Sequence, residues 1–390
     1  MIGTERDPRQ HPLSSIGALA LLLVGCVAPS SPQASVRPAI GVPQARAQTT
    51  SGQRTMQPSV RPVYTPPPMP VRRPAPPPPP VAPAALSATI DRLGRDFGGK
   101  LGIAVVSTDQ CWSTAFNGDV PMPQQSVSKL WVAITLMDLR DQGRLTLDDP
   151  ITVRPEDITL FHSPVSALVK GDGYRTTVRD LLARAMMSSD NTANDRLLNY
   201  VGGPEAVRRM VAQKGLGSIK FGPGERLLQS QTAGLAWRQE YAGRAFYTAR
   251  ANLPLVTRQK AFDAYVANPM DGAAASAIAH ALVRLHKGEL LSEGSTAHLM
   301  GLMEGSRTGK ERLRGGVPVG WRFGHKTGTG QDLMGRTAGY NDVGILIAPD
   351  GRSYGLAVLI GDTRRPIRER QALMQAVVQA IVASHAAPLG

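Results

Sequence analysis

The stretch that decides the fold runs from Gln125 to Ile134 and reads Gln-Ser-Val-Ser-Lys-Leu-Trp-Val-Ala-Ile. It places Ser126 and Lys129 three residues apart at the start of an apolar segment that continues to Leu139. Residues at this spacing lie on the same face of a helix, so the hydroxyl and the amine face the same way. The apolar residues predict the buried central helix of a domain, with Ser126 near its electropositive N-terminal end. The pair is therefore a candidate nucleophile with a base beside it.

Two further motifs follow along the chain. A Ser-x-x-Lys pair alone is a weak signal, because it is usually a helix start with a solvated lysine. Here it is followed by Ser189-Asp190-Asn191 and by Lys326-Thr327-Gly328-Thr329. The three motifs in this order resemble the class A serine beta-lactamases and their penicillin-binding relatives. The resemblance covers about residues 85 to 390 and implies an α+β fold, with an antiparallel sheet flanked by helices and an all-helical subdomain.

The resemblance implies a role for each of the first two motifs. Ser126 would attack the amide carbonyl of the substrate, and Lys129 would take or relay its proton. Ser189 would hand a proton to the departing ring nitrogen, while Asn191 would bind the side-chain amide of the substrate. Asp190 is expected to brace the loop. The alternative for this motif is a simple helix cap, for which Ser-Asp-Asn is well suited.

The third motif is expected on the opposite wall of the cleft. By resemblance, Lys326 and Thr327 would bind a substrate carboxylate, and the glycines from Gly328 onward would allow close approach of the substrate backbone. The backbone N–H groups of Ser126 and Thr329 would form an oxyanion hole. Burial beside a second cation would lower the pKa of Lys129, and Lys326 is the candidate for that cation.

Hydrolysis of an acyl-serine needs a group that activates water. The resembling enzymes use a glutamate in a Glu-x-x-Leu-Asn loop, and the matching stretch here is Glu225-Arg226-Leu227-Leu228-Gln229. Glu225 is the candidate, with Gln229 in place of asparagine. The alternative is that Glu225 is a solvated loop residue, in which case Glu240 is the reserve candidate.

An insertion of about residues 230–267 follows this loop and is rich in arginine and tyrosine. The spacing from Tyr241 to Asn252 predicts a helix that covers the surface or recognises larger substrates. Arg336 is a weaker candidate for a carboxylate contact, with a solvated arginine as the alternative. His162 is assigned either to a wall of the site or to a structural role. We expect no metal, because the histidines do not fall at ligand spacing, and no cofactor.

The N-terminal region divides into two parts before the folded domain at 85–390. Residues 1–26 resemble a bacterial lipoprotein signal, in which an apolar run is followed by Leu23-Val24-Gly25-Cys26. Cys26 is expected to be acylated, which would anchor the protein to a membrane. We expect this to be the outer membrane, with the folded domain facing the periplasm. The alternatives are a plain signal peptide cut later, giving a secreted soluble protein, or a buried apolar segment. Residues 27–84 are proline-rich and predict a disordered tether.

Charge and composition limit the classes of binding partner that fit this chain. Six of the charges behind the formal net charge of +14 are arginines between residues 29 and 84, where there is no acid. The rest of the chain has no dense basic helix, so nucleic acid is a poor candidate partner. Peptidoglycan or an anionic membrane surface fits the charge better. Cys111 is the second of two cysteines and is expected to be a small buried side chain.

Periodicity predicts the remaining elements. We expect helices over residues 86–97, 177–187, 204–214, 273–286 and 367–384, and strands over residues 101–106, 111–116, 149–153, 323–326, 343–348 and 354–360. The sheet is thus built from both ends of the domain, with helices inserted between them.

The resemblance implies a serine beta-lactamase that hydrolyses the beta-lactam amide through an acyl-serine. We expect a monomer, although no sequence pattern shows the oligomeric state. Two alternatives share the same three motifs. One is a D-alanyl-D-alanine peptidase that acts on wall peptides, and the other is a penicillin-binding or wall-sensing lipoprotein that is acylated and stops there.

Overall fold

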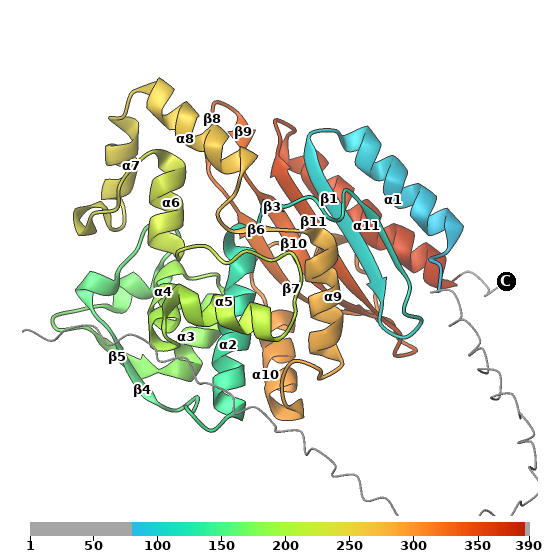
Figure 1. Cartoon of the computed structure of the whole chain (residues 1–390), viewed down its shortest axis with the longest axis horizontal. Coiled ribbons are helices and arrows are strands. Elements are labelled where there is room, and N and C mark those ends of the chain that lie inside the picture. The colour runs from blue at the N-terminus through green and yellow to red at the C-terminus, as the bar shows by residue number, and fades with distance from the viewer. Residues whose placement is uncertain (1–79, 387–390) are drawn as a thin grey trace, which may run out of the picture. The chain divides into compact units, whose positions relative to one another are not determined.

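A computed structural model describes residues 80–386 of the chain. The predicted lipoprotein signal, Cys26 and most of the predicted tether lie outside the described residues. No helix between residues 80 and 386 is long and apolar enough to cross a membrane. The described part is an α+β fold, as expected, in which one antiparallel sheet packs against helices and a largely helical region stands beside it (Figure 1).

The main sheet has five strands in the order β2-β1-β11-β10-β7, and every neighbouring pair is antiparallel. Both ends of the domain contribute to it, as predicted. The strands are β1 (Lys100–Ser107), β2 (Ser113–Phe116), β7 (Arg322–Thr329), β10 (Tyr340–Ile347) and β11 (Ser353–Asp362). Strand β7 forms the edge of the sheet nearest the helical region, which brings the third motif to the boundary between the two (Figure 1).

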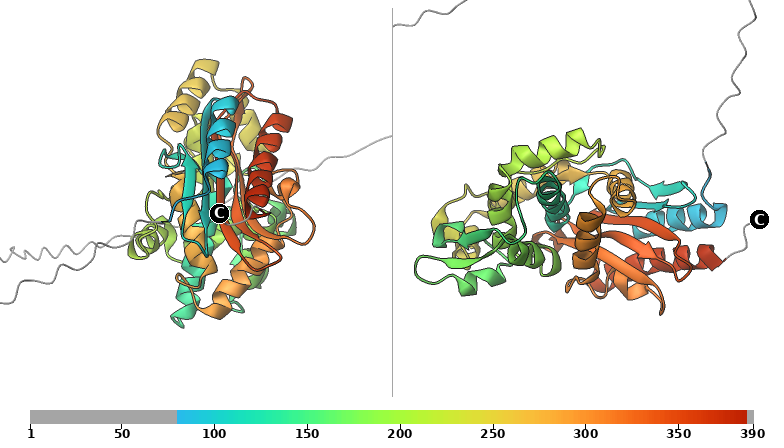
Figure 2. Two further views of the ribbon diagram at one scale, coloured as in Figure 1. Left: turned by 90° about the vertical axis from the view of Figure 1, so that its right-hand side faces the viewer. Right: turned by 90° about the horizontal axis from the view of Figure 1, so that it is seen from below.

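Helices cover both faces of this sheet, as the view down the sheet in Figure 2 shows. Helices α1 (Ala84–Phe97) and α11 (Ile367–Ala386) pack together on one face. A cluster of buried apolar side chains, including Ile90 and Val377, lies between them and the sheet. Helix α9 (Ala275–His286) covers the other face, with α10 (Glu293–Glu304) beside β7. Alternate strand residues thus face two separate cores.

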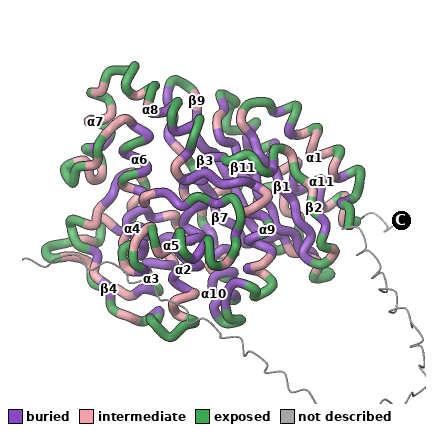
Figure 3. Tube along the Cα trace, in the orientation of Figure 1, coloured by how far each residue is buried: buried purple, intermediate pink, exposed green. Residues whose placement is uncertain are grey.

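The helical region is built around α2 (Lys129–Asp141), whose residues from Lys129 to Met137 are all buried (Figure 3). Helices α3 (Val178–Met187), α4 (Asn191–Tyr200) and α5 (Gly203–Gln213) pack around it. The expected central buried helix is therefore confirmed. Its apolar residues point in every direction because other elements surround it on all sides.

The insertion folds into a separate group of elements around α6 (Glu225–Ala233), namely the 3-10 turn Gln239–Tyr241, α7 (Ala245–Ala251) and α8 (Leu255–Ala267). The single helix predicted from Tyr241 to Asn252 is therefore wrong at its start. The chain breaks at Gly243, whose φ is +63° and whose N–H donates to the carbonyl of Thr159 at 2.9 Å. A contact with a distant loop overrides the local helical spacing at this point.

The remaining elements are short. Two-residue strands pair as β3 (Met122–Pro123) with β6 (Gly272–Ala273) and β8 (Asp332–Leu333) with β9 (Arg336–Thr337), and β4 (Pro150–Val153) pairs with β5 (Tyr174–Thr177). Four 3-10 turns complete the fold, at Gln125–Ser128, Pro155–Asp157, Pro164–Leu168 and Leu313–Gly316.

The expectation that Cys111 is buried is wrong. Its side chain is exposed, and the residue has a φ of +57° in the turn before β2. The strand predicted from residue 111 begins only at Ser113, because the two preceding residues still belong to the turn. Trp112 takes the buried position at this corner instead.

Candidate active site

The three motifs meet at a cavity of about 340 Å³ between the helical region and the end of β7. Ser126 lies in the 3-10 turn before α2, and Ser189 and Asn191 lie at the turn that begins α4. Thr327 and Thr329 line the opposite wall from β7. Side chains from three separate parts of the chain thus converge on one hollow.

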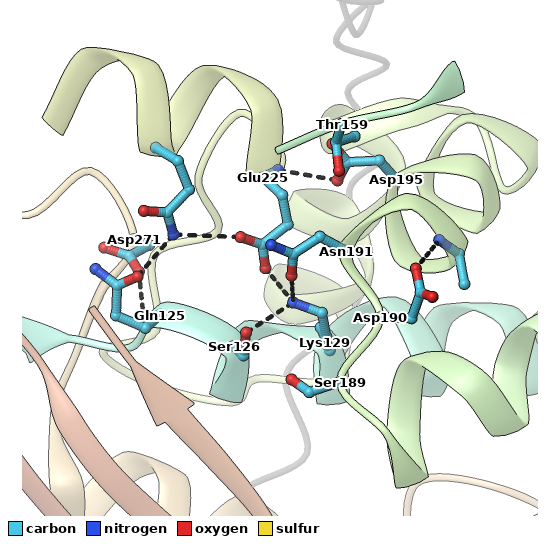
Figure 4. A network of polar contacts seen from close by, with 12 residues as sticks. Gln125, Ser126, Lys129, Thr159, Ser189, Asp190, Asn191, Asp195, Glu225 and Asp271 are labelled. Carbon is cyan, nitrogen blue, oxygen red and sulfur yellow. Dashed lines mark hydrogen bonds and ion pairs between the residues drawn. The ribbon is translucent and has the colours of Figure 1, made fainter. Parts of the chain in front are cut away.

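Lys129 stands at the centre of the polar contacts behind Ser126 (Figure 4). Its Nζ donates to Ser126 Oγ at 2.8 Å and to Asn191 Oδ1 at 2.9 Å. The side chain is 1% exposed. Because Lys129 opens α2 only three residues after Ser126, helical spacing alone aims the amine at the hydroxyl.

Glu225 makes an ion pair with Lys129 through Oε1 and is 2% exposed. The alternative of a solvated loop residue is therefore excluded. Glu225 is the first residue of α6, and its N–H donates to Asp195 Oδ1 at 2.9 Å. That carboxylate caps the helix start and points the glutamate at the lysine. The reserve candidate Glu240 is exposed and pairs with Arg238.

The second motif is connected to the third by one hydrogen bond. Lys326 Nζ donates to Ser189 Oγ at 2.9 Å. Burial lowers the pKa of Lys326 well below its ordinary value, and the charge of Lys129 lowers it further. Asp190 accepts from the N–H groups of Val165 and Ala193, which is the bracing role expected of it.

The glycine of the third motif has a different neighbour from the one expected. Gly328 does not line the cavity, and a Cβ there would lie 2.3 Å from the carbonyl oxygen of Gln124. The close approach that requires glycine is thus made by the chain's own backbone, next to the turn that carries Ser126. Lys326 also lies behind the cavity wall, fully buried, whereas Thr327, Thr329 and the next glycine, Gly330, line the cavity.

The expected contact from Arg336 is not formed at this site. Arg336 is outside the cavity lining and pairs with Asp263 and Asp362. Arg312 takes its place in the wall and donates to Thr329 Oγ1 at 2.6 Å. Burial lowers the pKa of Arg312, and its guanidinium lies 3.8 Å from the ring centre of Tyr340. Sequence reasoning missed Arg312, although it begins the segment Arg312-Leu313-Arg314-Gly315-Gly316 just before the third motif.

Three glutamines form a hydrogen-bonded chain that was not predicted, and two of them, Gln229 and Gln331, line the cavity. Gln331 Nε2 donates to Gln229 Oε1 at 3.1 Å, and Gln229 Nε2 donates to Gln125 Oε1 at 2.8 Å and to Glu225 Oε2 at 3.3 Å. All three side chains are buried. We call Gln331, Gln229 and Gln125 the glutamine chain. It holds the carboxylate of Glu225 from the side opposite Lys129.

The glutamine chain ends on the inserted segment. Gln125 Nε2 donates to Tyr265 Oη at 2.7 Å, and Tyr265 donates to Asp271 Oδ1 at 2.9 Å. Burial raises the pKa of Asp271 to about 6, and Glu225 adds to that effect. Asp271 Oδ2 also accepts the N–H of Gln125 at 2.7 Å. The insertion therefore supports the residue next to the nucleophile.

Aromatic side chains from the insertion form the outer wall. Tyr247 of α7 lines the cavity and is 51% exposed. Its ring meets Phe161 edge-on with centroids 5.7 Å apart, and Phe246 packs against Phe161 at 4.9 Å. His162 also lines the cavity, beside Phe161. The expected role of the insertion as a surface cover thus extends to the mouth of the site.

The chain is similar to known proteins over most of its length. A family model described as the beta-lactamase enzyme family matches residues 85–384. The extended-spectrum beta-lactamase PER-1 of Pseudomonas aeruginosa is 30% identical over 280 residues, which cover 72% of this chain and 80% of PER-1.

Solved structures agree with this similarity. A beta-lactamase from Chitinophaga pinensis is 25% identical with a TM-score of 0.63, covering 77% of this chain and 99% of its own. A variant of the last common ancestor of the class A beta-lactamases of Gram-negative bacteria is 30% identical with a TM-score of 0.62, covering 77% of this chain and 98% of its own.

Proposed function

The chain belongs to the beta-lactamase enzyme family, in its class A branch, and we propose that its serine hydrolase chemistry runs through Ser126. The observation that carries this proposal is the line of contacts from Ser126 to Lys129 to Glu225. It supplies a nucleophile, an amine that can relay its proton and a carboxylate, the last two of them buried. The substrate class is the beta-lactams, on which the family acts.

The first half of the reaction is acylation. Ser126 Oγ attacks the carbonyl carbon of the beta-lactam, and its proton passes to Lys129 or through it to Glu225. When the ring C–N bond breaks, Ser189, hydrogen-bonded to Lys326, gives its proton to the nitrogen. Ser189 is reprotonated with the proton taken from Ser126, so that Lys129 and Glu225 return to their starting states before hydrolysis begins. The product is an ester on Ser126. The N–H groups of Ser126 and Thr329 are assigned to the oxyanion that forms on the way.

The second half is hydrolysis of that ester. Glu225 takes a proton from a water, whose oxygen attacks the ester carbon, and the C–O bond to Ser126 breaks. The proton returns to Ser126 Oγ, and the acid product leaves. Hydrogen bonds from Lys129 on one side and Gln229 on the other fix the carboxylate of Glu225 in one position.

Substrate binding is assigned to the cavity walls. Asn191 would bind the side-chain amide of the substrate, since it lines the cavity and its amide is held in place by hydrogen bonds to Lys129 and to the carbonyl of Leu160. A substrate carboxylate would meet Thr327 and the Arg312 guanidinium, with the charge of Lys326 behind them.

The test is a time course of a chromogenic cephalosporin with the full-length protein, with the intact mass recorded at the end. We expect sustained turnover with little covalent adduct. The Ser126→Ala protein should give neither turnover nor adduct. A single burst that leaves one acyl group on Ser126 would contradict hydrolysis and point to a penicillin-binding protein or a peptidase acting on wall peptides.

We further propose that the protein is a lipoprotein facing the periplasm and anchored to the outer membrane through Cys26. The support is the sequence alone, where Leu23-Val24-Gly25-Cys26 closes an apolar run. Growth with a palmitate analogue should label the wild-type protein and not Cys26→Ala. Absence of label from both would favour a secreted soluble form. We also propose, from the sequence alone, that peptidoglycan is a second partner and that the protein is a monomer.

A further inference from the structure

A second hollow adjoins the active-site cavity and shares Tyr247 with it. Its volume is about 470 Å³, and it is lined by two arginines of the insertion, Arg250 and Arg258, and by Asp332, Leu333 and Met334. Because Tyr247 lines both hollows, they lie next to each other on either side of one side chain. We call this hollow the arginine subsite.

The guanidinium groups of these two arginines have few hydrogen-bond partners within residues 80–386. The Nε atoms of Arg250 and Arg258 are both buried and have no hydrogen-bond partner between residues 80 and 386. Neither guanidinium forms an ion pair with a carboxylate in that part of the chain. Within residues 80–386, the one hydrogen bond that these two guanidinium groups make is from Arg250 Nη2 to the carbonyl oxygen of Asp332, at 2.7 Å. These two Nε–H groups have no exposed surface, so the donors that a ligand in the hollow can meet are the Nη groups. Neither Nη atom of Arg258 is buried or has a hydrogen-bond partner among residues 80–386, which leaves them free to donate to a ligand.

Charge points to the same class of ligand. Burial lowers the pKa of Arg250, and the like charge of Arg258 lowers it further, with Asp332 offsetting only part of this. Two neighbouring guanidinium groups leave the hollow with an excess of positive charge. The planar donor fork of arginine matches a carboxylate, and the charged bond is stronger than a neutral one.

We propose that the arginine subsite binds a carboxylate carried at the end of a substrate side chain. The apolar side chains of Leu333 and Met334 and the ring of Tyr247 would contact the carbon atoms leading to that carboxylate. This inference rests on the proposed function, because it needs the rest of the substrate to lie next to Ser126. The preferred substrates are then beta-lactams whose side chain ends in an acid.

The experiment compares two oxyimino cephalosporins that differ only in whether the oxyimino ether ends in a carboxylate or in a methyl group. The readout is the ratio of their kcat/KM values. We expect Arg258→Gln to lower the ratio of carboxylate to methyl substrate about tenfold, and Arg258→Lys to lower it less because the charge is kept. Arg244→Gln, an exposed arginine of the same segment outside this hollow, should leave the ratio unchanged. An unchanged ratio in Arg258→Gln would overturn the proposal.

A binding measurement separates this proposal from the catalytic one. Titration calorimetry of the Ser126→Ala protein with the same two compounds needs no turnover. Tighter binding of the carboxylate compound, lost with Arg258→Gln added and weakened by salt, supports the subsite even if the wild-type protein hydrolyses neither. Equal affinity for the two compounds rejects it even if both are hydrolysed. Melting temperatures of all variants verify that each is folded.

Discussion

The turn that carries Ser126 and Lys129 and the insertion that carries Tyr247 and Tyr265 reach the same site by different means. In the turn, Lys129 follows Ser126 by three residues, and this helical spacing places Lys129 Nζ 2.8 Å from Ser126 Oγ. In the insertion, residues more than a hundred positions from the nucleophile reach it only through tertiary packing. The chemistry is therefore encoded locally, while its support and its access are encoded by how distant segments pack.

The glutamine chain joins these two regions. It extends from Gln331 through Gln229 to Gln125, the residue before the nucleophile, and ends at Tyr265 of α8. Each partner is buried, so each lost hydrogen bond leaves a polar group without water to replace it. Variants along this path measure how far catalysis by the turn depends on the insertion.

The largest effect is expected from Glu225→Gln. The amide cannot accept a proton from water, so hydrolysis of the acyl-enzyme should slow by about a thousandfold while acylation continues. Intact mass during turnover should then show nearly complete acylation of Ser126. The control is Glu240→Gln, an exposed glutamate of the insertion. An unchanged steady-state rate in Glu225→Gln would remove this residue from the role.

The next effect concerns pH and Asp271. Burial raises its pKa from 3.8 to about 6, so between these values the folded protein binds a proton that the unfolded chain releases. Its contribution to stability is therefore fully present below pH 4 and is lost as the pH rises to 6. The free energy of unfolding of the wild type relative to Asp271→Asn should fall on the order of 3 kcal/mol from pH 4 to 7.

This comparison isolates Asp271, because Asp195, whose pKa is also raised to about 6 by burial, is present in both proteins. Asp172→Asn, an exposed carboxyl on a loop, should show no such change. If the difference in the free energy of unfolding between wild type and Asp271→Asn does not change with pH, Asp271 does not bind this proton in the folded state.

A smaller effect is expected from Tyr265→Phe. Removing the hydroxyl leaves Gln125 Nε2 and Asp271 Oδ1 each short of one buried partner, a cost of about 1–3 kcal/mol. Thermal unfolding should show a lower Tm, and the acylation rate should fall because Gln125 precedes Ser126. Tyr247→Phe removes an exposed hydroxyl and should leave the Tm in place. Equal Tm values for wild type and Tyr265→Phe would show that the insertion does not support the turn.

The smallest effect is expected from Gln229→Asn. The shorter side chain cannot reach Gln331, Gln125 and Glu225 together. We therefore expect hydrolysis of the acyl-enzyme to slow about threefold, which corresponds to part of the free energy of one hydrogen bond. Single-turnover kinetics with a chromogenic substrate separate this step from acylation. A faster reaction would mean that the glutamine itself limits hydrolysis.

Sequence reasoning predicted the architecture well, and the reason is physical. The spacing of apolar residues predicted α1, β1, α3, α9 and α11, and the structure contains each of them. The spacing is informative there because each element buries one apolar face, or one apolar run, against the rest of the domain. Glu225 was identified by the match of its stretch to the Glu-x-x-Leu-Asn loop. The structure adds that it is buried beside Lys129, which a sequence match cannot show.

The failures share one cause, which is that tertiary contacts override local patterns. The break at Gly243 depends on a loop eighty residues earlier, and the exposure of Cys111 depends on a turn whose corner Trp112 fills. Arg336 and Arg312 look alike in sequence, but acids on two other elements engage the first and leave the second to line the cavity. Gln125 and Gln229 lie in the stretches singled out in the sequence, but no local pattern shows that they bond to each other and to Gln331.

The order of strands has a consequence for how the protein is made. Strand β1 pairs with β11, so that Ala104 lies opposite Ala357, and β11 also pairs with β10. The centre of the sheet is thus missing until nearly the whole chain has left the ribosome. Sheets closed by such distant pairings assemble slowly. Until β11 has been made, β1 can pair only with β2, so that the sheet stays incomplete for most of synthesis.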